Sequence, residues 1–329
     1  MGEKLRRVSS VAAGLCATAV AAALSVSTGA LVPAATAAPV KPAATAQRLP
    51  EATPGHFRVA SFNVLGASHT PAGGKRAVGT TRIVWANQLL NRHGVDVAGL
   101  QEFQASQYMK FMEITQGAWA AYPGLQLKTI DSENSIIWRT AKFDLVNAST
   151  VNIPYFDGSP RAMPVVLLRD KASGMLTYFT NFHNPADTAQ HHNQGHWRSI
   201  ATDIEIKLQN QLMRTGVPHI MTGDMNDRSA YFCAVSAKSY TAAARPGTYR
   251  SHGLRGPCHA DKPRAVDWIL GAQRMTYSNY VEDRSHLVDI TTDHPVIVSS
   301  VDVTPQMLPN GWLADAPARL VPRVSWHRP

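Results

Sequence analysis

The sequence predicts an α/β fold built on mixed β-sheet. The first observation is that short apolar runs typical of strands alternate with longer segments of helical periodicity. The second is that several strand-like runs in the middle of the chain follow one another with no helix between them. The third is size, since 329 residues, 44% of them hydrophobic, can bury a substantial core without a partner chain.

Helical spacing of apolar residues is found over 82–91, 106–115 and 190–213. Four strand-like runs with no helix between them lie over 135–138, 143–146, 164–168 and 175–180. Parallel strands need a long crossover connection, whereas antiparallel neighbours need only a short turn. We therefore expect these four runs to pair antiparallel, in a mixed sheet rather than a doubly wound parallel one.

The first 37 residues have the features of an export signal. Lys4, Arg6 and Arg7 precede an apolar stretch over 11–24, and the small residues of 35–37 suit signal peptidase. The alternative, a membrane anchor, is disfavoured because Ser and Thr interrupt the apolar stretch. The Ala/Pro/Thr-rich segment 38–55 is expected to be a flexible linker, and the proline-rich segment 304–329 a tail. We expect a secreted, monomeric protein without a stable membrane anchor.

The charge and the cysteines fit an extracellular protein that meets polyanions. The formal net charge of +9 falls to +7 without residues 1–37, which hold three basic residues and one acidic residue. A basic surface favours nucleic acid or anionic headgroups, although it also serves ordinary solubility. Loss of Cys16 leaves Cys233 and Cys258, an even pair in an oxidising compartment. We expect a disulfide, which stabilises by roughly 3–4 kcal/mol in the chain-entropy model; two buried free thiols are the alternative.

Polar residues stand at the ends of the apolar runs, where neighbouring strands would bring them to one rim. Carboxylate, amide and imidazole groups gathered in this way predict a hydrolytic metal site. Taken singly, each has an ordinary alternative, such as an Asx turn that caps a strand or a structural histidine. The residues are Asn63, Glu102, His183, Asp224 with Asn226, Asp267, and Asp293 with His294.

Six short motifs, taken in order, resemble the endonuclease/exonuclease/phosphatase superfamily, also called the DNase I-like fold. They are SFNVL at 61–65, LQE at 100–102, NFH at 181–183, GDMN at 223–226, VDWIL at 266–270 and TDHPV at 292–296. Each motif alone is weak, but six in the family's order are hard to obtain by chance. The resemblance implies a four-layer sandwich over 56–303, in which two packed mixed β-sheets are flanked by helices.

The resemblance also implies a divalent metal. Asn63, Glu102 and Asp293 would be its ligands, and their hard oxygen atoms suit Mg²⁺ or Mn²⁺ rather than zinc. A buried unpaired carboxylate is costly, so Glu102 at the end of its apolar run needs a cation or solvent. The ordinary alternative for Glu102 is an exposed residue that starts a loop.

The remaining motif residues would carry the proton transfers and hold the phosphate. Asp224 and Asn226, two apart on a strand, point to one face, where the resemblance implies that Asp224 polarises the attacking water and Asn226 holds a phosphate oxygen. His294 would transfer the proton on the attack side, with Asp267 orienting its ring and favouring the imidazolium. His183 would lie across the phosphate, stabilising its charge or protonating the leaving oxygen.

This chain departs from the common family pattern beside His183. Many members have Thr or Ser immediately before this histidine, where the chain has Phe182, so a hydroxyl contact to phosphate is expected to be missing. An acidic residue that supports this histidine in some nucleases has its nearest counterpart in Glu133. The leaving-group side is therefore less well defined by the resemblance than the attack side.

Three histidines, His191, His192 and His196, open the segment that is expected to be helical. Their spacing matches no closed transition-metal site, so a solvated helix start is favoured over a second metal site. Arg198, which follows them, is the phosphate-binding candidate of this segment.

The sequence thus predicts a secreted, metal-dependent phosphodiesterase that cleaves nucleic acid by in-line attack of an activated water. The favoured substrate is DNA, and the favoured mode of cleavage is endonucleolytic. The basic balance, the cysteine pair and the wording HNPAD at 183–187 favour a nuclease. The alternative is a sphingomyelinase-like or other small-substrate phosphoesterase, for which an exposed aromatic hairpin is expected and only 119–122 is aromatic enough. A catalytically inactive binding module would have lost a ligand or a histidine, and none is lost.

Overall fold

A computed structural model describes residues 52–127, 129–260, 265–272 and 275–304. Its regular elements begin with β1, Gly55–Asn63, and end with β14, Val296–Val303. The predicted export signal, most of the predicted linker and nearly all of the predicted tail lie outside the described residues, so these remain predictions. Within the described ranges, no helix combines the length and the apolar character needed to cross a membrane.

The first sheet contains β1 and β14 together with β2 (Val97–Gln101), β3 (Trp119–Tyr122), β4 (Ser135–Arg139) and β13 (Thr276–Asp283). The six strands lie in the order β13-β14-β1-β2-β4-β3. β1 is parallel to β2, and every other pair is antiparallel. Because β2 is central and buried along its whole length, its apolar run does not alternate with polar residues.

The second sheet contains β5 (Phe143–Pro154), β6 (Pro160–Asp170), β7 (Leu176–His183), β8 (His219–Asp224), β9 (Thr241–Ala243) and β12 (Asp267–Ala272). Its six strands lie in the order β5-β6-β7-β8-β12-β9, in which only β7 and β8 are parallel. Two short strands, β10 (Tyr249–Arg250) and β11 (Cys258–His259), form a separate antiparallel pair.

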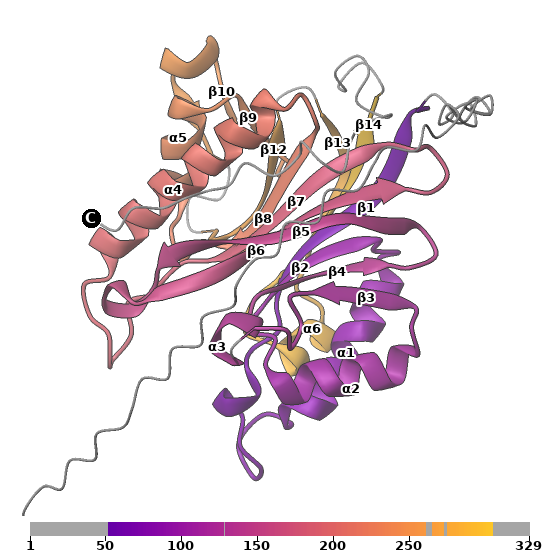
Figure 1. Ribbon diagram of the computed structural model, residues 1–329. Coiled ribbons are helices and arrows are strands. Elements are labelled where there is room, and N and C mark those ends of the chain that lie inside the picture. Colours follow the sequence, from indigo (N-terminus) through magenta and orange to yellow (C-terminus); the bar gives the residue numbers. More distant parts are fainter. Residues whose placement is uncertain (1–51, 128, 261–264, 273–274, 305–329) are drawn as a thin grey trace, which may run out of the picture. The chain divides into compact units, whose positions relative to one another are not determined.

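Helices cover the outer face of each sheet, which gives four layers (Figure 1). Helices α1 (Gly79–Arg92), α2 (Ala105–Thr115) and α6 (His286–Thr291) pack on the first sheet, and α4 (Gly195–Arg214) and α5 (Ser229–Lys238) pack on the second. A third apolar cluster lies between the sheets, where Phe57, Phe143 and Phe179 meet edge to face. The predicted sandwich of two mixed sheets flanked by helices is confirmed.

A polar seam, made of hydrogen bonds between β7 of one sheet and β2 of the other, fixes how the two sheets are positioned along their strands. Asn181 of β7 donates to the backbone oxygen of Leu100 at 2.8 Å and accepts from Gln101 at 2.6 Å, both on β2. A Cβ atom on Gly99 would lie 2.0 Å from the hydroxyl of Thr222 and 2.4 Å from the amide oxygen of Asn181, so only glycine permits this approach. The seam therefore sets where β2, β7 and β8 end relative to one another.

The predicted helices over 82–91 and 106–115 are confirmed as α1 and α2, but the third begins later than expected. It starts at Gly195 rather than at residue 190, because Asn193 adopts a left-handed conformation (φ 56°) and the side chain of Gln194 binds Asp157. The predicted antiparallel pairing is confirmed for β5, β6 and β7, whereas β4 pairs in the other sheet. Between β4 and β5 the chain passes from the first sheet to the second. The absence of a helix between two strands therefore does not show that they belong to the same sheet.

Cys233 on α5 and Cys258 in β11 form a disulfide, with their Cα atoms 5.6 Å apart, as expected from the sequence. The bond ties the β10–β11 pair to α5. Arg250 of β10 reinforces this link, because its guanidinium donates to the backbone oxygen of Gly256 at 2.6 Å and to the hydroxyl of Ser236 on α5 at 3.0 Å. The β10–β11 pair is therefore held against α5 both covalently and by hydrogen bonds.

Glu205, a buried residue of α4, is expected to make stability depend on pH. Its carboxyl accepts a 2.5 Å hydrogen bond from the Tyr231 hydroxyl, and burial raises its pKa to about 7 from an ordinary 4.5. The unfolded chain then loses this proton at lower pH than the folded protein does. The free energy of unfolding should fall between about pH 4.5 and 7, by on the order of 3 kcal/mol.

Urea unfolding at pH 5 and pH 8 tests this expectation. Glu205→Gln should show a smaller loss of stability between the two pH values than the wild-type protein. Glu113→Gln, at an exposed residue of α2, is the matched control and should behave like wild type. Equal losses in wild type and Glu205→Gln would contradict the assignment.

Candidate active site

The polar residues predicted at the strand ends meet at one rim of the sandwich. Strands β1, β2, β7 and β8 end there, and β12 and β14 begin there because they run antiparallel to β8 and β1. In the second sheet, Asp224 on β8 is the direct register partner of His183 on β7 and of Asp267 on β12. The residues at the rim are Asn63, Glu102, His183, Asp224, Asp267 and His294.

Asp224 is at the centre of this group and is 1% exposed. Its Oδ2 lies 3.7 Å from Nε2 of His183 and 3.5 Å from Nε2 of His294, and it accepts a hydrogen bond from the Asn63 amide at 3.2 Å. Its Oδ1 accepts from the backbone N–H of Asn226 at 3.0 Å. One buried carboxylate thus faces two imidazoles, as the sequence predicted for an attack site and a leaving-group site on either side of a phosphate.

Asp267 holds His294 as predicted. Both carboxylate oxygens of Asp267 lie 3.1 Å from Nδ1 of His294, so Nδ1 carries the proton and Nε2 is directed to Asp224. Burial alone would lower the pKa of His294, but the charge and hydrogen bond of Asp267 outweigh it and raise the pKa to about 10. Burial and the charge of Asp267 raise the pKa of Asp224. The His294 imidazole therefore lies between two carboxylates, Asp267 at Nδ1 and Asp224 at Nε2.

His183 has a different environment. It is buried, which lowers its pKa despite the nearby charges of Asp224 and Glu102. Phe182 before it is fully buried in the core, so this position offers no hydroxyl to a phosphate. Glu133 accepts from Gln104 at 3.2 Å and pairs with Arg161 at 3.5 Å, and burial raises its pKa.

Glu102 is held firmly with its carboxylate facing the pocket. The residue has a left-handed backbone (φ 57°), which costs about 1–2 kcal/mol for a side chain of this kind and is often retained at functional sites. Its oxygens accept one hydrogen bond each, from the Asn63 amide at 2.9 Å and from the Gly66 N–H at 2.8 Å. Burial opposes ionisation, but the charge of His183 and these two hydrogen bonds hold the pKa of Glu102 below its usual range.

Asn63 lies at the predicted position, but its NH₂ group rather than its amide oxygen faces the two carboxylates. Its amide oxygen accepts from the N–H of Leu65 at 3.0 Å, and its NH₂ group donates to both Glu102 and Asp224. Asn63 therefore positions two carboxylates, and the oxygen predicted to ligate a metal is turned away. The reason is the turn after β1, which brings the Leu65 N–H back over the asparagine.

The predicted ligand set is assembled only in part. Asp293 is exposed, and it does not line the pocket that holds Glu102. Within the described ranges, one group of three acidic or histidine side chains has its ligand atoms within 4.8 Å of one another. It consists of Asp224, Asp267 and His294. Glu102 still fits a hard divalent cation, because it lines the pocket and each of its oxygens accepts a single hydrogen bond, with Nε2 of His69 a further 3.4 Å from Oε2.

A pocket of about 480 Å³ opens over these residues. Asn226 lines it, with its NH₂ group fixed to the backbone oxygen of Asn184 at 2.9 Å. Sequence reasoning missed Tyr155 and Phe156 of the β5–β6 turn and Arg161 at the start of β6, because they belong to no motif. The only signal was a pair of aromatic residues in a turn followed by an arginine. His191 of the β7–α4 loop also lines the pocket, although a solvated position was favoured for it.

Arg161, which is paired with Glu133 at 3.5 Å, lines the pocket, whereas Arg198 does not. Arg198 donates to Asp187 at 2.7 Å and to the backbone oxygen of Pro185 at 2.9 Å and does not line the pocket. Its charge is used to brace the loop after β7, so its predicted phosphate contact is not supported by its position. Arg161 is buried, stacks its guanidinium 3.6 Å from the ring centre of Tyr155 and faces the pocket.

The three histidines before α4 also separate. His191 lines the pocket, where its Nδ1 lies 2.6 Å from Asp157, whereas His192 and His196 are exposed and do not line it. The prediction of a solvated segment therefore fits two of the three. His191 differs because the late start of α4 turns it back towards the β5–β6 turn.

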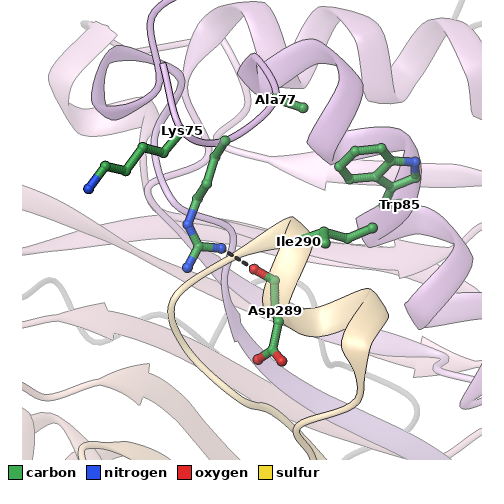
Figure 2. A pocket seen from close by; sticks show the side chains of 6 residues that line it. Lys75, Ala77, Trp85, Asp289 and Ile290 are labelled. Carbon is green, nitrogen blue, oxygen red and sulfur yellow. Dashed lines mark hydrogen bonds between the residues drawn. The ribbon is translucent and has the colours of Figure 1, made fainter. Parts of the chain in front are cut away.

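A second hollow, of about 420 Å³, lies between the residues before α1 and α6 and shares no lining residue with the first (Figure 2). Arg76 lines it and donates to the backbone oxygens of Asp289, drawn as a dashed line, and of Thr292 at 2.7 Å. The guanidinium caps the end of α6, where a cation is favourable. Lys75 extends away from Asp289 and Trp85. This hollow holds no predicted site residue, but Arg76 braces the helix that leads to His294.

Comparison with known proteins places the fold. No family model matches the sequence, and no curated protein matches it. A Bacteroides thetaiotaomicron protein of the endonuclease/exonuclease/phosphatase family has a similar structure, with 18% identity, 76% of this chain and 98% of that chain covered, and a TM-score of 0.58. A mannosyl-6-phosphatase of the same organism has 17% identity, coverage of 74% and 99%, and a TM-score of 0.53.

A third similar structure is ANGEL2, a 2′,3′-cyclic phosphatase in complex with adenosine-2′,3′-vanadate. It has 13% identity, coverage of 75% of this chain and 96% of that chain, and a TM-score of 0.56. The shared structure extends over nearly the whole of each neighbour, and the same motifs occupy one rim in this chain. The chain has the DNase I-like fold of the endonuclease/exonuclease/phosphatase superfamily.

Proposed function

We propose that this protein is a secreted, divalent-metal-dependent phosphodiesterase that hydrolyses internal bonds of nucleic acid, DNA above all. The observation that carries the proposal is the buried Asp224 carboxylate between two imidazoles, 3.7 Å from His183 and 3.5 Å from His294. A phosphate held over Asp224 has a proton-transfer group on each side, which is what in-line displacement at phosphorus requires.

The geometry supports a division of labour around the phosphate. On the attack side, the Asp224 carboxylate takes up the proton of the attacking water, and Asp267 holds the protonated His294 ring beside it through Nδ1. His183, from the other strand end, faces the leaving oxygen. Arg161 lies on the wall of the same pocket as a fixed positive charge for the phosphate oxygens.

The site fits one divalent cation of the Mg²⁺ or Mn²⁺ type. Glu102 would hold it through its free lone pairs, and Asn63 would keep Glu102 and Asp224 in place. When bound, such an ion supplies Lewis-acid polarisation of a phosphate oxygen. Among the acidic residues that line the pocket, Glu102 is the one whose pKa is held low, so it is the carboxylate best suited to bind a cation.

Charge and shape support a nucleic-acid substrate over a membrane lipid. The formal net charge is +9, and +7 without the predicted export signal. A similar structure binds an adenosine cyclic-phosphate mimic, in keeping with nucleotide chemistry on this fold. The segment that could have formed an exposed aromatic hairpin is β3, in which Trp119 is 1% exposed. The Cys233–Cys258 disulfide supports the secreted location, because such bonds persist outside the reducing cytosol.

The proposal is tested by incubating the purified protein with supercoiled plasmid and with single-stranded circular DNA, in Mg²⁺ or in EDTA. We expect nicking in Mg²⁺ only, and a loss of about 10²- to 10⁴-fold in His294→Ala, the range expected for a positioned acid–base group. His286→Ala, at an exposed histidine on α6, is the matched control and should retain activity. Intact DNA together with hydrolysis of sphingomyelin or mannose 6-phosphate would show that the substrate class is wrong.

A further inference from the structure

His69 lies beside Glu102 and lines the same pocket. Its Nε2 is 3.4 Å from Oε2 of Glu102, and its side chain is 57% exposed. Three other histidine–carboxylate pairs of this protein are closed by contacts of 2.6 to 2.7 Å, namely His56 with Asp302, His93 with Asp283 and His191 with Asp157. The gap at His69 is wider, so its ring and the Glu102 carboxylate are neighbours without the short contact found in those pairs.

The turn that carries His69 is fixed to the segment that carries Glu102. Three successive backbone N–H groups, those of Gly66, Ala67 and Ser68, donate to side chains that follow β2. The acceptors are Glu102 at 2.8 Å, Gln107 at 3.0 Å and Gln104 at 2.8 Å, respectively. The N–H of His69 itself donates to the backbone oxygen of Gly66 at 3.1 Å. The backbones of His69 and Glu102 are therefore held together, and ligands held in this way lose little conformational entropy when they bind an ion.

We propose that His69 is a second protein ligand of the divalent cation, through Nε2, beside the Oε2 atom of Glu102. The inference rests on the proposed function, which places the cation at Glu102. Two atoms bound about 2.1 Å from one octahedral ion, at right angles to each other, are about 3 Å apart. The observed separation of 3.4 Å is close to this value, and rotation of the half-exposed ring can close the difference. Water and a phosphate oxygen would take the remaining positions.

An imidazole ligand changes which ion the site prefers. Mg²⁺ takes oxygen ligands and gives up its waters reluctantly. First-row transition ions accept imidazole nitrogen more readily, and their affinity rises from Mn²⁺ to Co²⁺. We therefore expect the affinity of the site to rise in the order Mg²⁺, Mn²⁺, Co²⁺, with at least about tenfold between the first and the last.

The test is a calorimetric titration of the substrate-free protein, without a histidine tag, with each of the three ions. In His69→Leu, we expect the affinity for Co²⁺ to fall by at least about tenfold, because even residues that only orient a metal ligand contribute 10- to 100-fold. The affinity for Mg²⁺ should change much less, so the preference for Co²⁺ narrows. His69→Asp replaces the nitrogen ligand by an oxygen ligand, and it should keep Mg²⁺ binding while it loses the preference.

A spectroscopic measurement identifies the ligand directly. Electron spin echo envelope modulation of bound Mn²⁺ detects a coordinated imidazole nitrogen, and we expect this signal in the wild-type protein and its loss in His69→Leu. His56→Leu is the matched control, because His56 also faces a carboxylate, that of Asp302 at 2.6 Å, but does not line the pocket. It should keep both the nitrogen signal and the preference for Co²⁺. Thermal unfolding of each variant reports whether the fold is intact.

A role for His69 as an ion-pair partner of Glu102 alone predicts the opposite result. Removal of a positive imidazolium beside Glu102 would then strengthen the binding of every cation. Unchanged or tighter Co²⁺ binding in His69→Leu would therefore overturn the inference. A nitrogen signal that persists in His69→Leu would also overturn it, because the ion would then be bound to another imidazole, as at His294 between Asp224 and Asp267.

The nicking of supercoiled plasmid by the wild-type protein, measured in parallel, separates the inference from the proposed function. Metal-dependent nicking together with wild-type Co²⁺ affinity in His69→Leu would overturn the ligand and leave the phosphodiesterase standing. Intact plasmid together with a loss of Co²⁺ affinity and of the nitrogen signal in His69→Leu would overturn the nucleic-acid substrate and leave the ligand standing. A wild-type protein that binds none of the three ions would overturn both the ligand and the metal dependence.

Discussion

Asp224→Asn is expected to abolish activity and to make the metal-free protein more stable. The carboxylate faces both imidazoles, so its loss removes the group that the two proton-transfer sites share. We expect kcat/KM to fall by at least about 10²-fold, as for other preorganised charged groups at a reacting centre. Asparagine keeps the shape of the side chain but replaces one acceptor oxygen by an NH₂ group, so the hydrogen bond from Asn63 is lost together with the charge.

The gain in stability follows from the electrostatics of the same group. Burial and the neighbouring charge of Asp267 raise the pKa of Asp224, so the ionised form is disfavoured in the folded protein relative to the unfolded chain. Above the ordinary pKa of an aspartate, this difference lowers the stability of the wild-type protein. Removing the charge should raise the free energy of unfolding by roughly 0.5–2 kcal/mol, a size common for stabilising substitutions at functional sites.

Thermal unfolding measures this gain in stability and is done in EDTA. A bound cation would stabilise the ionised Asp224 of the wild-type protein and so mask the difference between the two proteins. Asp203→Asn is the matched control, since Asp203 is an exposed aspartate paired with Lys238 and lies away from the pocket. That variant should keep the activity and show no gain in melting temperature. A lower melting temperature for Asp224→Asn would mean that attraction to His183 and His294 outweighs burial and the repulsion from Asp267.

The rim of the site was predictable because it depends on strands, and strands have a simple period. Each apolar run has at one end a residue whose polarity would be costly in a core, and the ends of parallel strands meet the starts of their antiparallel neighbours at one edge. Asp224, Asp267 and His294 therefore meet as expected, with both Asp267 oxygens 3.1 Å from the His294 ring. The family motifs added the order in which the strands appear.

The walls of the pocket were not predictable, because loops set them through contacts distant in sequence. Gln194 binds Asp157, which lies in a different turn, and this contact delays the start of α4 and directs His191 into the pocket. The orientation of Asn63 likewise depends on one backbone N–H in the following turn. Arg161 and Arg198 look equally available in sequence, and only the fold shows that Arg198 is bound to Asp187.

Among residues outside the pocket, Arg82 of α1 is expected to contribute most to holding the site in place. Its guanidinium is fully buried and donates to five backbone oxygens and to the hydroxyl of Thr70, at 2.7 to 3.2 Å. The oxygens of 64–66 follow Asn63 in the chain, and that of Thr291 precedes His294. Gly66 in turn donates its N–H to Glu102. One side chain thus ties the loop after β1, which holds Glu102, to the residues just before His294.

Arg82→Met should destabilise the fold by about 3–5 kcal/mol, because several buried carbonyl oxygens lose their donor at once. Arg82→Lys keeps a charge but offers at most three donors from one point, so it cannot reproduce the fork. We expect this variant to fold with lower stability, to lose at least about tenfold in activity and to need more Mg²⁺ for half-maximal rate. Arg92→Met, at an exposed residue of the same helix, controls for loss of an arginine from α1. A folded Arg82→Lys protein with the wild-type Mg²⁺ dependence and rate would show that the loops hold Glu102 and His294 without this arginine.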